Sequence, residues 1–406
     1  MESAKIVAAL ARMVRDVGTA EDLAQDVLVT ALEKWPAVGM PDNPGAWLMA
    51  AAKRRAIDGF RRRRRAELVE WELGREAELR TEAVRREADP TMQEEIEDDL
   101  LRLIFTVCHP ILPQEGRVAL TLRTLAGLST EEIARAFLVS EATVAQRIVR
   151  AKRTLREARV PFEVPAGPEL APRLASVLEV VYLVFNEGYA ATSGEDWVRP
   201  ELCDDALRMG RILAMLTPAE SEVHGLIALM ELQSSRLGAR VGADGEPILL
   251  LDQDRKRWDR LLIRRGLAAL SLAQGLGGTL GPYALQASIA ACHAVAERAE
   301  ETDWPRIAAL YDALSQLLPS PIVALNRAVS YAMAYGTEAG MELVDELMDE
   351  PALQAYHLLP GVRGDFLAKL GRCAEAETEF IRAASLTRNN RERKLLLQRA
   401  ASCVGA

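Results

Sequence analysis

The chain has 406 residues, of which 49% are hydrophobic, 27% charged and only 5% aromatic, with a formal net charge of -9 at pH 7. This length predicts two or three domains rather than one. Long stretches rich in Ala, Leu, Arg and Glu, between sparse Gly and Pro residues, favour helices and exclude an all-β fold. We therefore expect an all-α protein. The average charge argues against nucleic-acid binding, but its distribution along the chain does not.

Charge is strongly segregated along the sequence. Residues 1–66 contain 12 basic and 8 acidic side chains, net +4, and residues 117–160 contain 9 and 4, net +5. Residues 67–116 carry net -9, and residues 161–406 carry another -9. Two basic blocks therefore flank an acidic segment and precede a larger acidic domain.

Cysteine usage and hydropathy indicate a cytoplasmic protein without metal or cofactor. The five cysteines are scattered, contain no CxxC pair, and fit reduced, buried thiols. No signal peptide is recognisable at the start. Residues 266–296 lack charged side chains, as in a membrane span, but Gly and Pro residues interrupt them. We predict two buried helices around a turn there, and no membrane association.

The first 66 residues predict three helices. Apolar spacing places helices over residues 3–16 and 19–34, with Thr19 as the N-terminal cap of the second and Pro36 ending it. Asn43-Pro44 is typical of a cap followed by proline in the first helical position. A helix over residues 45–65 should be apolar in its first half and arginine-rich in its second.

The next segments predict a linker and a helix-turn-helix. Residues 67–98 are highly charged and favour a linker, after which an amphipathic helix runs from Glu95. Ser129-Thr-Glu-Glu132 is a capping box for a short helix, and Ser140 caps a longer basic helix reaching Glu157. Such a pair is typical of a DNA-binding helix-turn-helix, although solvated basic helices have the same composition.

Beyond the prolines at 161–172, the chain predicts successive helices. Residues 370–383, with Gly364, Gly371 and Phe380, fit a tetratricopeptide unit. The spacing Tyr311, Asp345, Phe380 is close to the expected period, although the polar Asp345 makes a poor middle repeat.

Taken in order, these segments resemble extracytoplasmic-function (ECF) sigma factors of the sigma-70 family. Residues 20–32 (AEDLAQDVLVTAL) resemble region 2.2, which in that family docks on the β′ clamp helices of RNA polymerase. Residues 43–58 resemble regions 2.3 and 2.4, which open and read the minus-10 element. Residues 125–156 resemble region 4.2, which reads the minus-35 element. The resemblance implies region 2 over 1–66, an acidic linker over 67–98 and region 4 over 99–160.

The resemblance also implies site residues. For polymerase contact these are Asp22, Gln25 and Asp26. For the minus-10 element they are Asn43, Trp47, Lys53, Arg54, Arg55 and Arg61, together with a base-capturing loop over 38–43. For the minus-35 element they are Glu141, Ala142, Thr143, Gln146, Arg147, Arg150 and Lys152, with Arg153 and Arg156 continuing toward phosphates. Ala145 to Arg147 depart from the commoner pattern, which leaves base preference open, and a start so close to region 2.1 suggests a truncated N-terminus.

The long C-terminal segment resembles one subgroup in particular. ECF sigma factors of the ECF42 group carry a tetratricopeptide-containing extension, and residues 184–189 and 251–259 resemble it. The resemblance implies a helical, tetratricopeptide-like regulatory domain over 170–406. Asn186, Glu187 and Tyr189 fit a buried polar network, a contact to the sigma domains, or a ligand site. Asp252 and Asp254 with Glu187 could hold a divalent metal, but a capped helix start near Trp258 fits them better.

The leading hypothesis is a non-enzymatic sigma factor with a built-in regulator. Its partners would be core RNA polymerase (β′ clamp helices and β flap), promoter DNA, and a protein bound to the repeat domain. The alternatives are a polymerase-independent helix-turn-helix regulator with a ligand-sensing repeat domain, and a metal enzyme with a DNA-binding arm.

Overall fold

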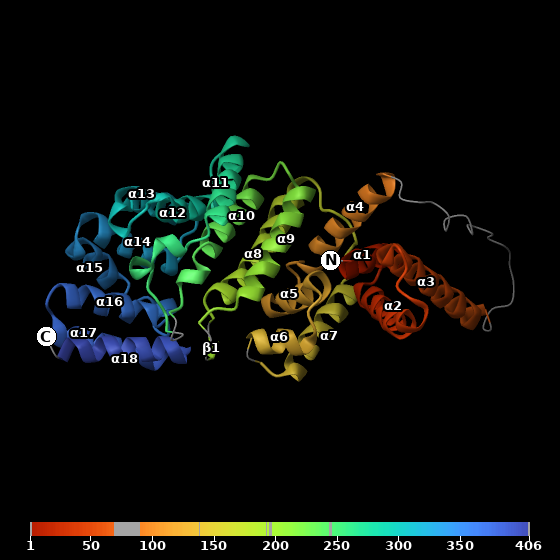
Figure 1. Ribbon diagram of the computed structural model, residues 1–406, viewed down its shortest axis with the longest axis horizontal. Helices are drawn as coiled ribbons and strands as arrows, with labels where there is room; N and C mark the ends of the chain where they lie inside the picture. Colours follow the sequence, from red (N-terminus) through yellow and green to blue (C-terminus); the bar gives the residue numbers. More distant parts are fainter. Residues whose placement is uncertain are drawn as a thin grey trace. The chain divides into compact units, whose positions relative to one another are not determined.

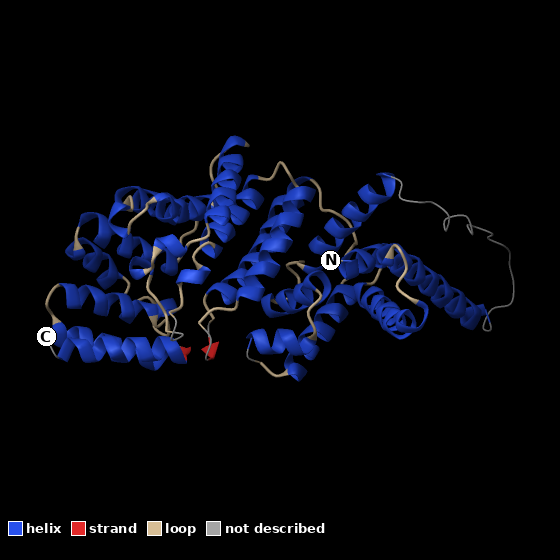
Figure 2. Ribbon diagram, in the orientation of Figure 1, coloured by secondary structure: helices blue, strands red, loops and turns tan. Residues whose placement is uncertain are grey.

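The computed structural model describes residues 2–68, 90–137, 139–191, 193–194, 197–242 and 246–404. Helices make up most of these residues, and each strand is only two residues long (Figure 2). The all-α prediction is confirmed. The chain divides into two compact units, Met1–Val180 and Val181–Ala406, and each is described separately below.

The first unit is built around its first helix. Its elements are α1 (Glu2–Val14), α2 (Val17–Val38), α3 (Pro44–Leu68), α4 (Pro90–Val107), α5 (Gln114–Thr121), the π-helical turn η1 (Leu122–Ala126), α6 (Thr130–Phe137), α7 (Glu141–Glu157), the 3-10 turn η2 (Gly167–Glu169) and the first half of α8 (Leu170–Tyr189). Figure 1 labels the α-helices among them. Helix α1 packs against α2, α3, α4 and η1. Ile6 and Leu10 of α1 are fully buried, so this helix supplies much of the core shared by these elements.

Both ends of α2 differ from the prediction. The N-terminal cap is Asp16 rather than Thr19, because the Asp16 carboxylate accepts a hydrogen bond from the Thr19 backbone N–H at 2.7 Å. The helix also continues through Pro36 to Val38. Pro36 has no backbone N–H to donate to the Leu32 carbonyl, yet the helix continues for two residues beyond it. Gly39, at φ +85°, ends the helix and donates its N–H to the Trp35 carbonyl at 2.9 Å.

The third helix starts where the sequence predicts, whereas the fourth starts earlier. The Asn43 side chain accepts from the Ala46 N–H at 3.0 Å, which confirms Asn43-Pro44 as a helix start. Helix α4 begins at Pro90, before the predicted Glu95, so the end of the predicted linker is helical. Linker residues 69–89 lie outside the described residues.

The boundary between the two units falls inside a helix. Arg173 of α8 donates to the Phe105 carbonyl at 2.8 Å, and Ser176 donates to the Cys108 carbonyl at 2.6 Å. Arg117 of α5 contacts both Ser176 and Glu179 of α8. The start of the predicted extension therefore completes the core of the first unit.

The second unit consists almost entirely of helices, most of which pack against neighbours in the chain. Its elements are the second half of α8, β1 (Ser193–Gly194), α9 (Pro200–Leu216), α10 (Ser221–Ser234), η3 (Leu237–Ala239), η4 (Leu250–Asp252), η5 (Arg255–Arg257), α11 (Arg260–Gly275), α12 (Pro282–Val295), η6 (Ala299–Glu301), α13 (Trp304–Leu317), α14 (Pro321–Tyr335), α15 (Thr337–Glu346), η7 (Pro351–Leu353), α16 (Leu358–Lys369), α17 (Cys373–Leu386), β2 (Arg388–Asn389) and α18 (Asn390–Val404). The uncharged stretch over 266–296 forms parts of α11 and α12, separated by a turn as predicted. Helix α12 is largely buried, but Leu272 of α11 is 48% exposed, so the predicted burial is wrong for the end of α11. No helix among the described residues is long and apolar enough to span a membrane.

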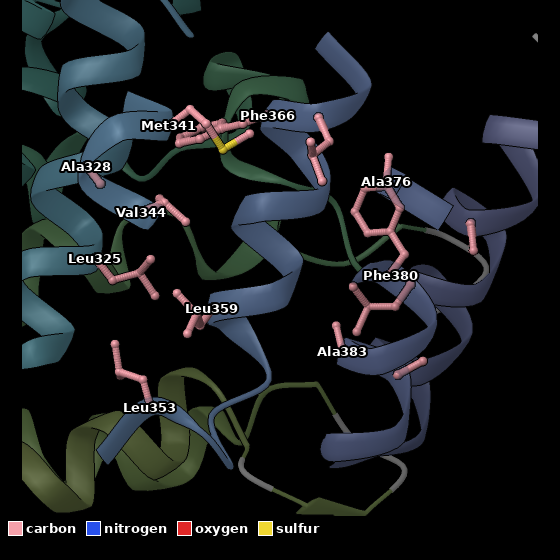
Figure 3. Packing of buried hydrophobic residues seen from close by; sticks show 14 residues of the cluster. Leu325, Ala328, Met341, Val344, Leu353, Leu359, Phe366, Ala376, Phe380 and Ala383 are labelled. Carbon is pink, nitrogen blue, oxygen red and sulfur yellow. The ribbon is translucent and has the colours of Figure 1, made fainter. Parts of the chain in front are cut away.

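The C-terminal helices form a continuous hydrophobic core. Side chains of α14, α15, α16 and α17 converge in Figure 3, among them Leu325, Val344, Leu359 and Phe380. Gly364 allows α16 and α17 to approach closely, because a Cβ atom there would lie 3.0 Å from the Phe380 ring. These are the residues that predicted a tetratricopeptide-like pair, and the helical hairpin is observed; assignment to that repeat family stays a prediction.

A short parallel pairing joins two distant segments of the second unit. Strand β1 pairs with β2, Ser193 opposite Arg388, and the buried Asn389 side chain donates to the Ala191 carbonyl at 3.1 Å. The segment after α8 is thereby fixed against the segment before α18.

Candidate nucleic-acid interface

The predicted helix-turn-helix is formed by α6 and α7. Ser129 and Glu132 exchange hydrogen bonds at the start of α6, with Glu132 Oε2 accepting from the Ser129 N–H at 2.7 Å and Ser129 Oγ accepting from the Glu132 N–H at 3.1 Å. These hydrogen bonds lower the pKa of the exposed Glu132. Ser140 Oγ accepts from the Thr143 N–H at 3.1 Å and caps α7. Both predicted caps are confirmed.

Helix α7 has one buried face and one exposed face. Val144, Ile148, Ala151 and Leu155 are buried at helical spacing and fix the rotation of α7. Among the predicted minus-35 residues, Ala142, Gln146 and Arg150 are exposed, and they lie four residues apart on one face. The arrangement suits a helix that presents amide, guanidinium and small side chains to base edges and phosphates.

The other predicted minus-35 residues lie beside this face. Glu141 is exposed and accepts from the Thr130 hydroxyl at 3.0 Å, while Thr143 and Arg147 are half-buried. Val149 was not predicted, although it is 64% exposed on the same helix. A valine there can contact the methyl group of thymine.

Lys152 and Arg156 point toward α2 rather than away from the protein. Arg156 Nε and Nη2 each lie 2.9 Å from a different oxygen of Asp16. Lys152 Nζ lies 2.7 Å from Glu21 and 3.7 Å from Asp22. The basic end of the helix-turn-helix is thus paired with the acidic start of α2.

The ion pair with Arg156 changes the acidity of Asp16. Burial by itself would raise the Asp16 pKa, but hydrogen bonds from Arg156 and Thr19, with the Arg156 charge, lower it from 3.8 to about 2. Asp16 therefore serves both as the cap of α2 and as the anchor of α7.

Glu21 is the buried centre of this contact. Besides Lys152, its carboxylate accepts from Arg123 Nε at 2.7 Å and from the Gln25 amide at 2.6 Å. Gly18 makes the approach of the helices possible, because a Cβ atom there would lie 3.3 to 3.4 Å from the Arg156 and Lys152 side chains. We refer to the contacts of Asp16, Glu21 and Asp22 with Arg123, Lys152 and Arg156 as the α2–α7 ion-pair cluster, Arg123 belonging to η1.

The predicted minus-10 residues surround α3. Asn43 is exposed and occupied as the helix cap, and Trp47 packs edge-on against Trp35 with ring centroids 5.6 Å apart. Arg54 is exposed and Lys53 half-buried, so both ammonium and guanidinium groups lie at the surface of α3. The side chain of Arg61 lies outside the described residues.

Arg55 contacts α2. Its guanidinium lies 3.4 Å from Asp26 and donates to the Thr30 hydroxyl at 2.8 Å. Asp26 was predicted to contact polymerase and Arg55 to contact DNA, and the structure joins them in one ion pair. Their roles in binding stay predictions.

Helix α2 exposes both acidic and apolar side chains. Asp22 and Asp26 are exposed, whereas Gln25 is half-buried and bonded to Glu21. Val29 and Leu32 follow on the same side of α2, and Leu32 is 74% exposed. An apolar residue so exposed beside two carboxylates is typical of a protein-binding surface, and its exposure could not be read from the helical pattern.

Each candidate residue of the second unit has a partner within that unit. Glu187 is buried and forms an ion pair with Arg199. Asn186 hydrogen-bonds the Tyr182 hydroxyl, and Tyr189 stacks on Phe185 with centroids 5.8 Å apart. A contact of these residues with the sigma domains stays a prediction.

The acidic residues considered for metal binding have structural partners. Asp254 accepts from the Lys256 N–H, and Glu187 pairs with Arg199. Asp259, from the helix start predicted near Trp258, caps α11 by accepting from the N–H groups of Leu261 and Leu262. Within the described ranges, no group of three or more His, Cys, Asp or Glu side chains is arranged to hold a metal ion.

Comparison with protein families assigns a class to the first unit. Residues 2–66 match Sigma-70 region 2, and residues 102–155 match Sigma-70, region 4. Residues 173–274 match a family of unknown function (DUF6596). A region 2 match followed by a region 4 match, with the helix-turn-helix in the latter, supports a transcription factor of the ECF sigma type.

Individual relatives extend this assignment. Over 390 residues the chain is 45% identical to an uncharacterized protein of Rhizobium meliloti (strain 1021). The match covers 95% of this chain and 90% of that protein, so this chain belongs to the same family as that protein. It is also 27% identical over 168 residues to the probable ECF RNA polymerase sigma factor SigI of Mycobacterium tuberculosis, in two strains. That match covers 40% of this chain and 54% of SigI.

Proposed function

We propose that this protein is a sigma factor that binds core RNA polymerase and directs initiation at specific promoters, under the control of its C-terminal helical domain. The observation that carries the proposal is the exposed face of a doubly capped helix-turn-helix in a region 4 domain that follows a region 2 domain. Region 2 adds the exposed Asp22, Asp26 and Leu32 on α2, which suit a protein partner.

The α2–α7 ion-pair cluster suggests how free and bound forms differ. Asp22 is a proposed polymerase contact, and Lys152 is a proposed DNA contact, yet the two side chains face each other. They cannot bind each other and their separate partners at once. The form with these ion pairs is therefore the unbound form in this proposal, and binding polymerase separates α7 from α2.

The C-terminal domain supplies regulation in this proposal. It belongs to the ECF42-like type by resemblance, and its consecutive helical hairpins suit binding of a further protein. Cytoplasmic localisation, the β′ clamp helices and the β flap as polymerase contacts, and tetratricopeptide repeats are parts of the same proposal.

Co-elution with core polymerase tests the function. The full chain, mixed with core enzyme and promoter DNA, should elute together with polymerase. When polymerase is omitted, the chain should bind duplex DNA only weakly and elute apart from it. Tight binding to duplex DNA without polymerase, as a dimer, would instead support the helix-turn-helix regulator.

A further inference from the structure

Three arginines lie in the interior of the second unit without acidic partners. Arg236 exposes 8% and Arg255 exposes 4% of its surface, and Arg240 is half-buried. Among the described residues, no aspartate or glutamate lies within ion-pair distance of any of the three, although Glu231 close by in sequence pairs with Arg211 and Arg265. Uncompensated buried cations are costly, so this cluster needs a specific explanation.

The three guanidinium groups alternate with aromatic rings. The Arg240 Cζ lies 3.8 Å from the centroid of Tyr189, and the Arg236 Cζ lies 5.7 Å from the same ring. Trp258 lies between the next two, 5.9 Å from Arg236 and 5.0 Å from Arg255. Contacts with ring faces attract cations but leave the positive charge in place.

The same cluster contains hydrogen-bond donors without acceptors. These buried atoms are Nε of Arg236, Arg240 and Arg255 and Nε1 of Trp197 and Trp258. Trp197 belongs to the group because its ring lies 5.6 Å from the Arg240 Cζ. Nearly all buried N–H groups in proteins have a partner. All five of these N–H groups lack a hydrogen-bond acceptor.

The neighbouring histidine adds no charge and no anion. Burial, followed by the charges of Arg236 and Arg255, lowers the pKa of His293 to about 3. The imidazole is therefore neutral near pH 7, and the net charge of the cluster comes from the arginines alone.

Arg255 has a structural role that sets it apart. One nitrogen of its guanidinium donates to the carbonyls of His293 and Ala296 at 2.8 and 2.9 Å, and the other donates to the Thr302 hydroxyl at 2.9 Å. It therefore holds the end of α12. No hydrogen bond from the Arg236 side chain to a described residue is found, and Arg240 contacts chiefly the Tyr189 ring and hydroxyl.

We propose that Arg236 and Arg240 bind a small ligand that carries a phosphate or carboxylate group. The planar guanidinium fork matches the oxygens of both groups, and such an anion would supply the missing charge and the missing acceptors together. The burial of Arg236 excludes a nucleic-acid backbone, so the ligand is a small molecule. The three arginines and the aromatic residues Tyr189, Trp197 and Trp258 all lie within residues 173–274, which match the family of unknown function.

The test measures anion binding by the full chain. Melting temperature and calorimetric affinity are followed with inorganic phosphate and with citrate, at constant ionic strength against chloride. Stabilisation by phosphate alone assigns a phosphate ligand, and stabilisation by citrate alone assigns a carboxylate. Arg236→Met and Arg240→Met should each weaken binding at least about tenfold, whereas Arg264→Met, at an exposed position on α11, should not.

The unliganded variants separate binding from structure. Removing an uncompensated cation should leave the melting temperature of Arg236→Met equal to or above that of the unmodified chain in chloride buffer without phosphate or citrate. The proposal is overturned if the unmodified chain responds to phosphate and citrate no more than to chloride. It is also overturned if Arg236→Met and Arg240→Met respond to both anions as the unmodified chain does.

Discussion

Asp16 caps α2 and binds Arg156, so one side chain joins local helix stability to the packing of two sigma regions. The sequence predicts the nearby Thr19 as the cap, because threonine is a frequent cap residue. Asp16 and Thr19 both precede the same apolar pattern, so the pattern does not distinguish them. The structure assigns the cap to Asp16 since its carboxylate also meets a guanidinium 140 residues away. No local pattern contains that partner.

The Asp16 pair makes stability depend on pH in the acid range. Because the folded-state pKa is about 2, below the ordinary 3.8, the contribution is complete above about pH 4 and is lost as pH falls through 2. Asp16→Asn should lower the free energy of unfolding by about 1–2 kcal/mol at pH 7 and flatten the stability profile between pH 4 and 2. Chemical denaturation across this range measures it, and an unchanged profile in the variant would contradict the assigned pKa.

The exposed face of α7 predicts two kinds of DNA defect. Gln146→Ala should cost about 1–3 kcal/mol at one base pair of the minus-35 element and relax specificity there. Arg150→Ala should weaken binding to all promoters alike and reduce its salt dependence. Fluorescence anisotropy with polymerase and promoter fragments gives both, and Arg264→Ala serves as the charge-matched control. Equal losses for all three variants would argue against recognition by this face.

At the scale of elements, local signals were predicted well and long-range contacts were not. Asn43, Ser129 and Ser140 were identified as caps because a cap and its backbone donor lie within three residues. The end of α2 at Val38 differs from the prediction, because proline usually marks a helix end and here it lies within the last turn. The α2–α7 ion-pair cluster could not be predicted, because sequence shows charges but not which helices meet.

Opening of the α2–α7 ion-pair cluster should favour the polymerase-bound form. Arg156→Gln removes one exposed end of the cluster, and a partly exposed pair contributes about 1 kcal/mol, which corresponds to about fivefold tighter core polymerase binding. The effect should shrink at high salt. Binding titrations with core enzyme measure it, with Arg153→Gln, paired within α7 to Glu157, as the control. Weaker binding by Arg156→Gln alone would show that this residue contacts the bound complex instead.

The apolar part of α2 carries a separate prediction. Leu32→Ser should reduce core polymerase binding by about 1–2 kcal/mol while leaving thermal stability unchanged, because the side chain is exposed in the free protein. Met215→Ser, at a comparably exposed position in the second unit, is the control. If both variants bind like the unmodified chain, this face of α2 is not the docking surface.

At the scale of the whole molecule, the charge segregation was visible in the sequence, whereas the division of the chain was not. The sequence placed the extension at residue 170, but Arg173 and Ser176 bond to the end of α4, and the boundary lies within α8. The arginine and aromatic cluster was equally hidden, since Tyr189 and Trp258 are far from Arg236 and Arg240 in the sequence and meet them only in the folded unit. Dispersed clusters of this kind leave no periodic pattern.

The boundary inside α8 determines how the extension should be removed. A chain ending at Val180 keeps Arg173, Ser176 and Glu179, which contact α4 and α5, whereas a chain ending at Val160 loses them. We expect the shorter chain to melt at a lower temperature, and thermal unfolding of the two truncations checks this. Identical melting temperatures would mean that these contacts contribute no stability.

Run-off transcription with core polymerase tests the sigma assignment most directly. The full chain and the chain ending at Val180 are compared on promoter templates, with core enzyme alone as the control. We expect initiation from a defined start site that depends on the added chain, and a difference in rate between the two chains gives the sign of the control by the C-terminal domain. Failure of both chains to initiate on any promoter template would contradict the account.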